Sequence, residues 1–228
     1  MYSADYETGE IFLYDAIGDP WWGMIGAENV INDLAKMGGK RVTMRIASPG
    51  GSVDEGRAIY NAAKRYPGGV DVVVDSSAYS IASYIAMAGE RVVMAKNAMM
   101  MIHSPLTLAM GNAAQLREIA NILDKYADSV IAAYAEKSGK TDKEISKIMD
   151  GNGKEDGTWY TAQEAVDNGF ATEIGDILPG DAPTFAKAMY GKPKDEPKNQ
   201  EPSAGSRTPW TVAAREVRRQ TLRAMFGR

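Results

Sequence analysis

The sequence predicts an α/β fold with a mainly parallel sheet. Runs rich in β-branched residues alternate with helical patterns as far as about residue 178, which is typical of βαβ units. The run VDVVVD is almost continuously apolar, as expected for a strand that is covered on both faces. A helical pattern from about Asn112 to Ser138 would be about 38 Å long. That length exceeds a compact domain and predicts an arm that projects towards another subunit.

The first part of the chain alternates strands and helices. We expect a strand in EIFLYDAI, a helix in AENVINDLAKM that two glycines end, and a second strand in RVTMRIAS. The following SPGGSV predicts a turn. The helix expected in DEGRAIYNAAKRY has an acidic first turn and a basic last turn, which suits the helix dipole.

The strand VDVVVD leads into a serine-rich turn and an apolar helix, IASYIAMAG. Two short strands are expected in RVVMA and AMMMIH before the long helix. Two capping boxes follow, Thr141 with Glu144 and Thr161 with Glu164, because each glutamate lies three residues after a hydroxyl. FATEIG predicts the last strand.

The amino-acid composition excludes several kinds of catalytic and metal chemistry, and it restricts the fold less. The 228 residues are 44% hydrophobic, enough for one α/β domain with extensions. We expect a cytosolic protein, since no run is long enough to span a membrane and the first residues do not resemble a signal peptide. With no cysteine and one histidine, thiolate metal sites and a zinc site built on several imidazoles are excluded, and any imidazole base must be His103. We expect no metal and no cofactor. The net charge of -4 argues against a nucleic-acid surface.

Three predicted strand ends carry the residues best suited to catalysis. A Gly50-Gly51 turn follows one strand, a serine at a helix mouth follows the next, and His103 ends a third. Strand ends meet at one edge of a parallel sheet, so these groups are expected to lie together. Each group alone is more often structural: a tight turn, a capping serine or a hydrogen-bonded histidine.

Among the serines, Ser80 is the favoured nucleophile. It directly precedes an unbroken helix, whose free first-turn N–H groups can stabilise a developing oxyanion. Ser76 and Ser77 are expected in the preceding turn, and Ser83 is expected to pack one helical turn further on. A serine hydroxyl needs a base to take its proton, and His103 is the available imidazole.

These residues resemble a known family. ASPGGSVDEGRAIYNAAKRY, SSAYSIASYIAMAG, MMMIHSP, AYAEKSGKTDKEISKIM and TWYTAQEAVDNGF resemble the ClpP-type serine proteases in order and spacing. The resemblance covers about residues 10–178 and is closest to the ClpP-like head maturation (prohead) proteases of tailed phages. It implies the ClpP/crotonase-like spiral of βα units, with the long helix as the handle by which rings of subunits pair.

The resemblance also implies roles for individual residues. Ser80 would be the nucleophile and His103 the general base, and the N–H groups of Gly51 (or Gly50) and Ile81 would form the oxyanion hole. The chain departs from the family pattern in two places. Tyr79 replaces the small residue usual before the serine. An alignment without a gap puts Gly157 where the third triad residue is expected.

The segment around Gly157 looks expanded, so a neighbouring acid is expected to complete the triad. Asp156 is the first choice, with Glu155 and Asp150 as alternatives. A solvated loop acid is an equally good interpretation of Asp156.

The function expected from the resemblance is that of a serine endopeptidase that assembles into rings. Its substrates would be phage scaffold and capsid proteins, cleaved during head maturation in the host cytoplasm or the prohead. Alternatives are a housekeeping ClpP-like peptidase working with an ATP-driven unfoldase, and a non-catalytic assembly protein with the same fold. Crotonase-type acyl-CoA chemistry would use the paired glycines but would leave the serine and histidine unexplained.

The last residues differ in composition from the rest. We expect a protease domain over residues 1–189, a disordered linker rich in Pro, Lys, Glu and Ser over 190–208, and a basic helical tail over 209–228. The tail could dock on a partner, be removed, or have no role.

Overall fold

The computed structural model describes residues 1–153 and 157–175. The expected linker (190–208), the expected tail (209–228) and the expected end of the protease domain at residue 189 all lie outside the described residues. The strands are β1 (Tyr2–Asp5), β2 (Glu10–Leu13), β3 (Val42–Ser48), β4 (Val70–Tyr79), β5 (Val92–Ala95), β6 (Met99–Ile102), β7 (Thr158–Thr161) and β8 (Glu173–Gly175). The helices are η1 (Pro20–Trp22), α1 (Ala27–Lys36), α2 (Val53–Arg65), α3 (Ile81–Ala86), α4 (Ala113–Ser138), α5 (Asp142–Met149), η2 (Gly151–Gly153) and α6 (Ala162–Asp167).

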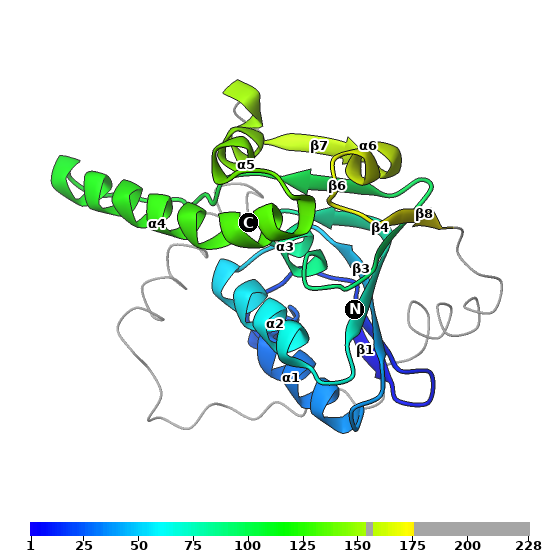
Figure 1. The fold of residues 1–228 in the computed structure, drawn as a ribbon. Coiled ribbons are helices and arrows are strands. Elements are labelled where there is room, and N and C mark those ends of the chain that lie inside the picture. The colour runs from blue at the N-terminus through cyan, green and yellow to red at the C-terminus, as the bar shows by residue number, and fades with distance from the viewer. Residues whose placement is uncertain (154–156, 176–228) are drawn as a thin grey trace, which may run out of the picture. The chain divides into compact units, whose positions relative to one another are not determined.

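One mainly parallel sheet organises these elements (Figure 1). Its strand order is β1-β2-β3-β4-β5-β8, with β6 paired to β4 and β7 paired to β6. Among the strands of the described residues, only β1 and β7 run antiparallel to their neighbours. Strand β4 forks: Val72–Val74 pair with β5, while Ser77–Tyr79 pair with β6. The fork brings the end of β4 beside the end of β6.

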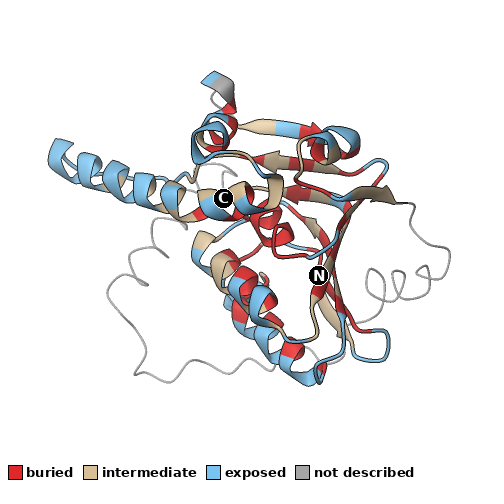
Figure 2. Cartoon of the chain, viewed as in Figure 1, coloured by how far each residue is buried: buried red, intermediate tan, exposed pale blue. Residues whose placement is uncertain are grey.

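The two faces of the sheet are buried differently. Alternate residues of β2, β3 and β4 point into one large apolar core that also contains side chains of α1, α2 and α3. Buried residues are concentrated in the sheet and in α3 (Figure 2). On the opposite face, the buried Arg45 guanidinium is paired with the carboxylates of Glu10 and Asp75, and the Tyr14 hydroxyl donates to Asp75. This face therefore carries a buried ionic cluster rather than a second large apolar core.

Helix α4 confirms the expected long helix. Asn112 caps it in a capping box with Gln115, and Gly139 ends it in the left-handed conformation. Its 26 residues span about 39 Å. Its C-terminal part packs on the core through Val130, Ala133 and Tyr134, whereas its N-terminal half projects and is exposed (Figures 1 and 2). No helix in the described ranges is long and apolar enough to cross a membrane.

Most expected elements are found, and both predicted capping boxes are present. The prediction of a turn at Ser76 and Ser77 was wrong, because β4 continues through both to Tyr79. Pairing with β6 explains the extension, since it satisfies backbone groups that a turn would leave open. Strands β1 and β7 were not predicted from the sequence. Each is a four-residue strand that is defined by its antiparallel partner rather than by a long apolar run.

Candidate active site

Ser80 occupies the sharp turn between β4 and α3. Its backbone angles are φ 56° and ψ −131°, and it is the one non-glycine residue with positive φ among the residues described. Such a conformation costs about 1–3 kcal/mol and persists where the surroundings hold it. A strained serine between a strand and a helix is the arrangement that exposes a nucleophile at the edge of a sheet.

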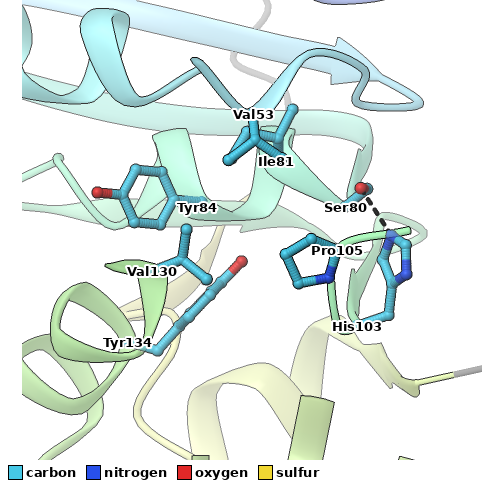
Figure 3. A pocket seen from close by; sticks show the side chains of 8 residues that line it. All are labelled: Val53, Ser80, Ile81, Tyr84, His103, Pro105, Val130 and Tyr134. Atoms are coloured by element: carbon cyan, nitrogen blue, oxygen red, sulfur yellow. Dashed lines mark hydrogen bonds between the residues drawn. The ribbon is translucent and has the colours of Figure 1, made fainter. Parts of the chain in front are cut away.

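His103 follows β6 and lies against Ser80. Ser80 N–H donates to the Met101 carbonyl at 2.9 Å, which continues the β4–β6 pairing up to the nucleophile. As a result the Ser80 Oγ lies 2.7 Å from His103 Nε2 (Figure 3). Burial lowers the pKa of His103 below its usual value, so the imidazole is neutral at neutral pH. A neutral ring with its proton on Nδ1 can accept the Ser80 proton at Nε2.

The glycine turn contacts the same site. Gly50 has φ +91°, and a Cβ there would lie 2.7 Å from Ser80 Cβ and 3.1 Å from the Ile81 nitrogen. Its own N–H donates to Ser48 Oγ at 3.1 Å. Only a glycine permits this approach, so the identity of residue 50 is required by the nucleophile turn.

Gly51 is the better placed of the two glycines to offer a free donor. Ile17 N–H donates to the Gly50 carbonyl, and Ser52 N–H donates to the Ile17 carbonyl, both at 2.8 Å. In this parallel bridge the N–H of the residue between them, Gly51, points away from Ile17. Within the described ranges neither Gly51 N–H nor Ile81 N–H has a hydrogen-bond partner, and Ile81 is the first residue of α3.

The acid of the predicted triad is not among the groups that the structure brings together. Asp156 and Glu155 lie outside the described residues. Asp150 accepts a hydrogen bond from Ser104 Oγ at 3.0 Å. No carboxylate in the described part of the chain bonds to His103, and burial accounts for the shift of the His103 pKa. Gly157 lies against His103, since a Cβ there would be 2.4 Å from His103 Cβ.

A small apolar pocket opens beside the serine and the histidine (Figure 3). Besides Ser80 and His103, it is lined by side chains from α2, α3, α4 and the segment after β6: Val53, Ile81, Tyr84, Pro105, Val130 and Tyr134. Its position next to Ser80 suits an apolar side chain of a bound peptide. Neither Tyr84 nor Tyr134 was predicted from the sequence as a site residue, because both occupy ordinary core positions of their helices.

Comparison with known proteins finds relatives of one family. A family model for the Clp proteases matches residues 1–177. The ATP-dependent Clp protease proteolytic subunit 1 of Protochlamydia amoebophila (strain UWE25) is 31% identical over 176 residues, which are 74% of this chain and 81% of that protein. The solved structure of a mutant ClpP1 from Listeria monocytogenes has a TM-score of 0.65 at 24% identity, and the match covers 77% of this chain and 95% of the other.

The family model and the Protochlamydia relative define a serine-type peptidase. The chain belongs to the Clp protease family. The predicted ClpP-like α/β fold is confirmed by the similarity to the Listeria structure.

Proposed function

We propose that the chain is an endopeptidase in which Ser80 is the nucleophile and His103 the general base. The observation that carries the proposal is the 2.7 Å contact between Ser80 Oγ and His103 Nε2 at a strained strand-to-helix turn. His103 would take the hydroxyl proton as Oγ attacks the peptide carbonyl, and would then give it to the leaving amine. Water would release the acyl group from Ser80 by the reverse proton path.

The N–H groups of Gly51 and Ile81 are proposed to stabilise the tetrahedral oxyanion. Ile81 directly follows Ser80, and Gly51 directly follows Gly50, which lies against Ser80. Neither N–H group is used elsewhere within the residues described. The Gly50 N–H is engaged by Ser48, which makes Gly50 a steric rather than a donating part of the site. Two fixed donors in a site shielded from water are worth several kcal/mol of barrier, about 3–4 kcal/mol for one donor.

Asp156 remains the proposed third member of the triad. It directly precedes Gly157 in the sequence, and Gly157 packs on His103. Its carboxylate would hold the His103 tautomer with the proton on Nδ1. Replacing Asp156, Glu155 and Asp150 one at a time by the corresponding amide tests the assignment. We expect only Asp156→Asn to lower kcat strongly.

Labelling with a fluorophosphonate, followed by intact-mass measurement and peptide mapping, tests the catalytic proposal. We expect one adduct, on Ser80, and none in Ser80→Ala or His103→Ala. Ser76→Ala is the matched control, because Ser76 is exposed on β4, the strand that leads into the Ser80 turn. Stoichiometric binding of peptides without labelling or turnover would instead indicate a non-catalytic assembly protein.

Self-association through α4 is proposed as the route to a ring-shaped assembly. Leu106, Leu108 and Met110, in the segment before α4, are 74%, 88% and 94% exposed. Leu116 and Ile122, on the projecting half of the helix, are also exposed. So much exposed apolar surface is typical of a protein interface. Sedimentation of Leu116→Lys should show smaller assemblies than wild type, whereas Asn121→Lys, on an exposed polar position of α4, should not.

For the biological role, we propose cleavage of phage scaffold and capsid proteins during head maturation. The proposal rests on the resemblance of LYDAIGDPWWG to the phage group and on the extension from residue 190 onward, which housekeeping ClpP proteins mostly lack. Co-expression with the capsid precursor, followed by immunoblotting, tests it. An intact precursor counts against this role.

The alternative is a peptidase that works with an ATP-driven unfoldase, which the name of the Protochlamydia relative favours. Degradation of a folded protein only when an unfoldase and ATP are added would support the alternative. Degradation of capsid precursor without ATP would support the phage role.

A further inference from the structure

A buried chain of hydroxyl groups connects α4 to the backbone of the nucleophile. Ser83 Oγ donates to the Ser80 carbonyl at 2.6 Å and lies 2.8 Å from the Tyr134 hydroxyl. Because the Ser83 proton is used on the carbonyl, Tyr134 is the donor in the second bond. Ser83 is fully buried and Tyr134 almost fully. Burial raises the pKa of Tyr134 far above its usual range, so this donor keeps its proton at every working pH.

The chain ends on the one described non-glycine residue with positive φ. The Ser80 carbonyl accepts a second bond from Ser83 N–H at 2.9 Å, and Ser80 N–H is bound to Met101. Both backbone groups of the strained residue are thereby fixed. The direction of the Ser80 carbonyl sets the plane of the peptide that carries Ile81 N–H, the proposed oxyanion donor.

We propose that Ser83 and Tyr134 are positioning residues, which hold the peptide between Ser80 and Ile81 in the orientation that presents both the nucleophile and the oxyanion donor. The inference rests on the proposed role of Ser80. The alternative is that Ser83 and Tyr134 only fill space in the core, and that role does not require a hydroxyl at either position. An apolar core would take alanine and phenylalanine there without leaving a polar group to satisfy.

Tyr134→Phe tests the inference because it removes one oxygen and keeps the ring that lines the pocket. We expect kcat to fall roughly 10- to 100-fold, the cost of a misplaced reacting group. KM for a short peptide should stay within about twofold, because substrate binding is not the step affected. The rate of fluorophosphonate labelling of Ser80 should fall by the same factor as kcat. Tyr60→Phe is the matched control: Tyr60 is a buried tyrosine of α2 that has no hydrogen bond to the Ser80 turn within the described ranges.

A double-mutant cycle separates positioning from packing. If Tyr134 acts through Ser83, kcat of the Ser83→Ala, Tyr134→Phe double variant should equal that of Ser83→Ala alone. The melting temperatures of these two variants, unlike their kcat values, should differ. Ser83→Ala strands a buried tyrosine hydroxyl, and the second substitution removes that group, so the double variant should melt higher than Ser83→Ala.

The outcomes are distinguishable from those of the catalytic proposal. Peptidase activity that persists in Ser80→Ala would overturn both. Activity that depends on Ser80 but is the same in Tyr134→Phe as in Tyr60→Phe would overturn the positioning role alone. Additive losses of kcat in the double variant would also overturn it, because they would place the two hydroxyls on separate paths.

Discussion

Gly50→Ala should disable the nucleophile without unfolding the protein. The new Cβ would lie 2.7 Å from Ser80 Cβ and 2.6 Å from the Tyr79 carbonyl oxygen. Carbon atoms make ordinary contact at about 3.5 Å, so the Ser80 turn must retreat by about 0.8 Å. A misplacement near 1 Å costs about 100-fold in rate, so kcat should fall by about that factor.

The control for this substitution separates collision from backbone strain. Gly39 also has a left-handed φ, +80°, but a Cβ there meets nothing within 4 Å. Gly39→Ala should therefore carry the conformational cost of about 1 kcal/mol in stability and leave kcat unchanged. Steady-state hydrolysis of a fluorogenic peptide and thermal melting, measured on both variants, complete the assay. Equal kcat values in the two variants would refute the argument that Gly50 is needed for close approach to Ser80.

Three further outcomes follow from the same structure. Since the base must be neutral and burial lowers the pKa of His103 below its usual 6.5, the loss of kcat/KM on acidification should have its midpoint below pH 6.5, and a midpoint above 6.5 would contradict burial as the dominant effect on His103. Arg45→Ala should lower the free energy of unfolding by about 3–5 kcal/mol in urea titrations, because it leaves the buried carboxylates of Asp75 and Glu10 without their positively charged partner. Thr141→Ala removes the hydroxyl of a capping box and should lower the free energy of unfolding by about 1 kcal/mol. An unchanged midpoint of urea unfolding would count against a stabilising role of this cap.

The sequence predicted those parts of the fold that depend on local pattern. Helical spacing and caps located α1, α2, α4 and α5, because periodic apolar positions and capping residues act over one or two turns. The fork of β4 was not predictable in this way. Its last residues, Ser77 to Tyr79, form a strand because β6 offers them backbone partners, and that pairing is a tertiary contact.

The residues of the candidate site also divide into those that the sequence pattern predicts and those that depend on tertiary contacts. Ser80 and His103 were found because strand ends meet at one edge of a sheet and the chain has a single imidazole. Tyr79 was recognised as unusual, but its environment was not predicted. Its ring packs edge-on against Trp159 of β7, with centroids 5.0 Å apart, across the intervening strand β6. The bulky residue before the nucleophile is thus accommodated on the sheet face, away from the turn.

The strained backbone of Ser80 links these observations into one physical requirement. A conformation that costs about 1–3 kcal/mol must be held from several sides, or the turn will relax. Met101 holds the Ser80 N–H from β6, Ser83 holds its carbonyl from α3, and Gly50 closes against its side chain from the turn after β3. His103, by contrast, depends on β6 and on Gly157. Substitutions that loosen the three supports should therefore lower kcat while leaving the His103 pKa in place, which separates the geometry of the nucleophile from the chemistry of its base.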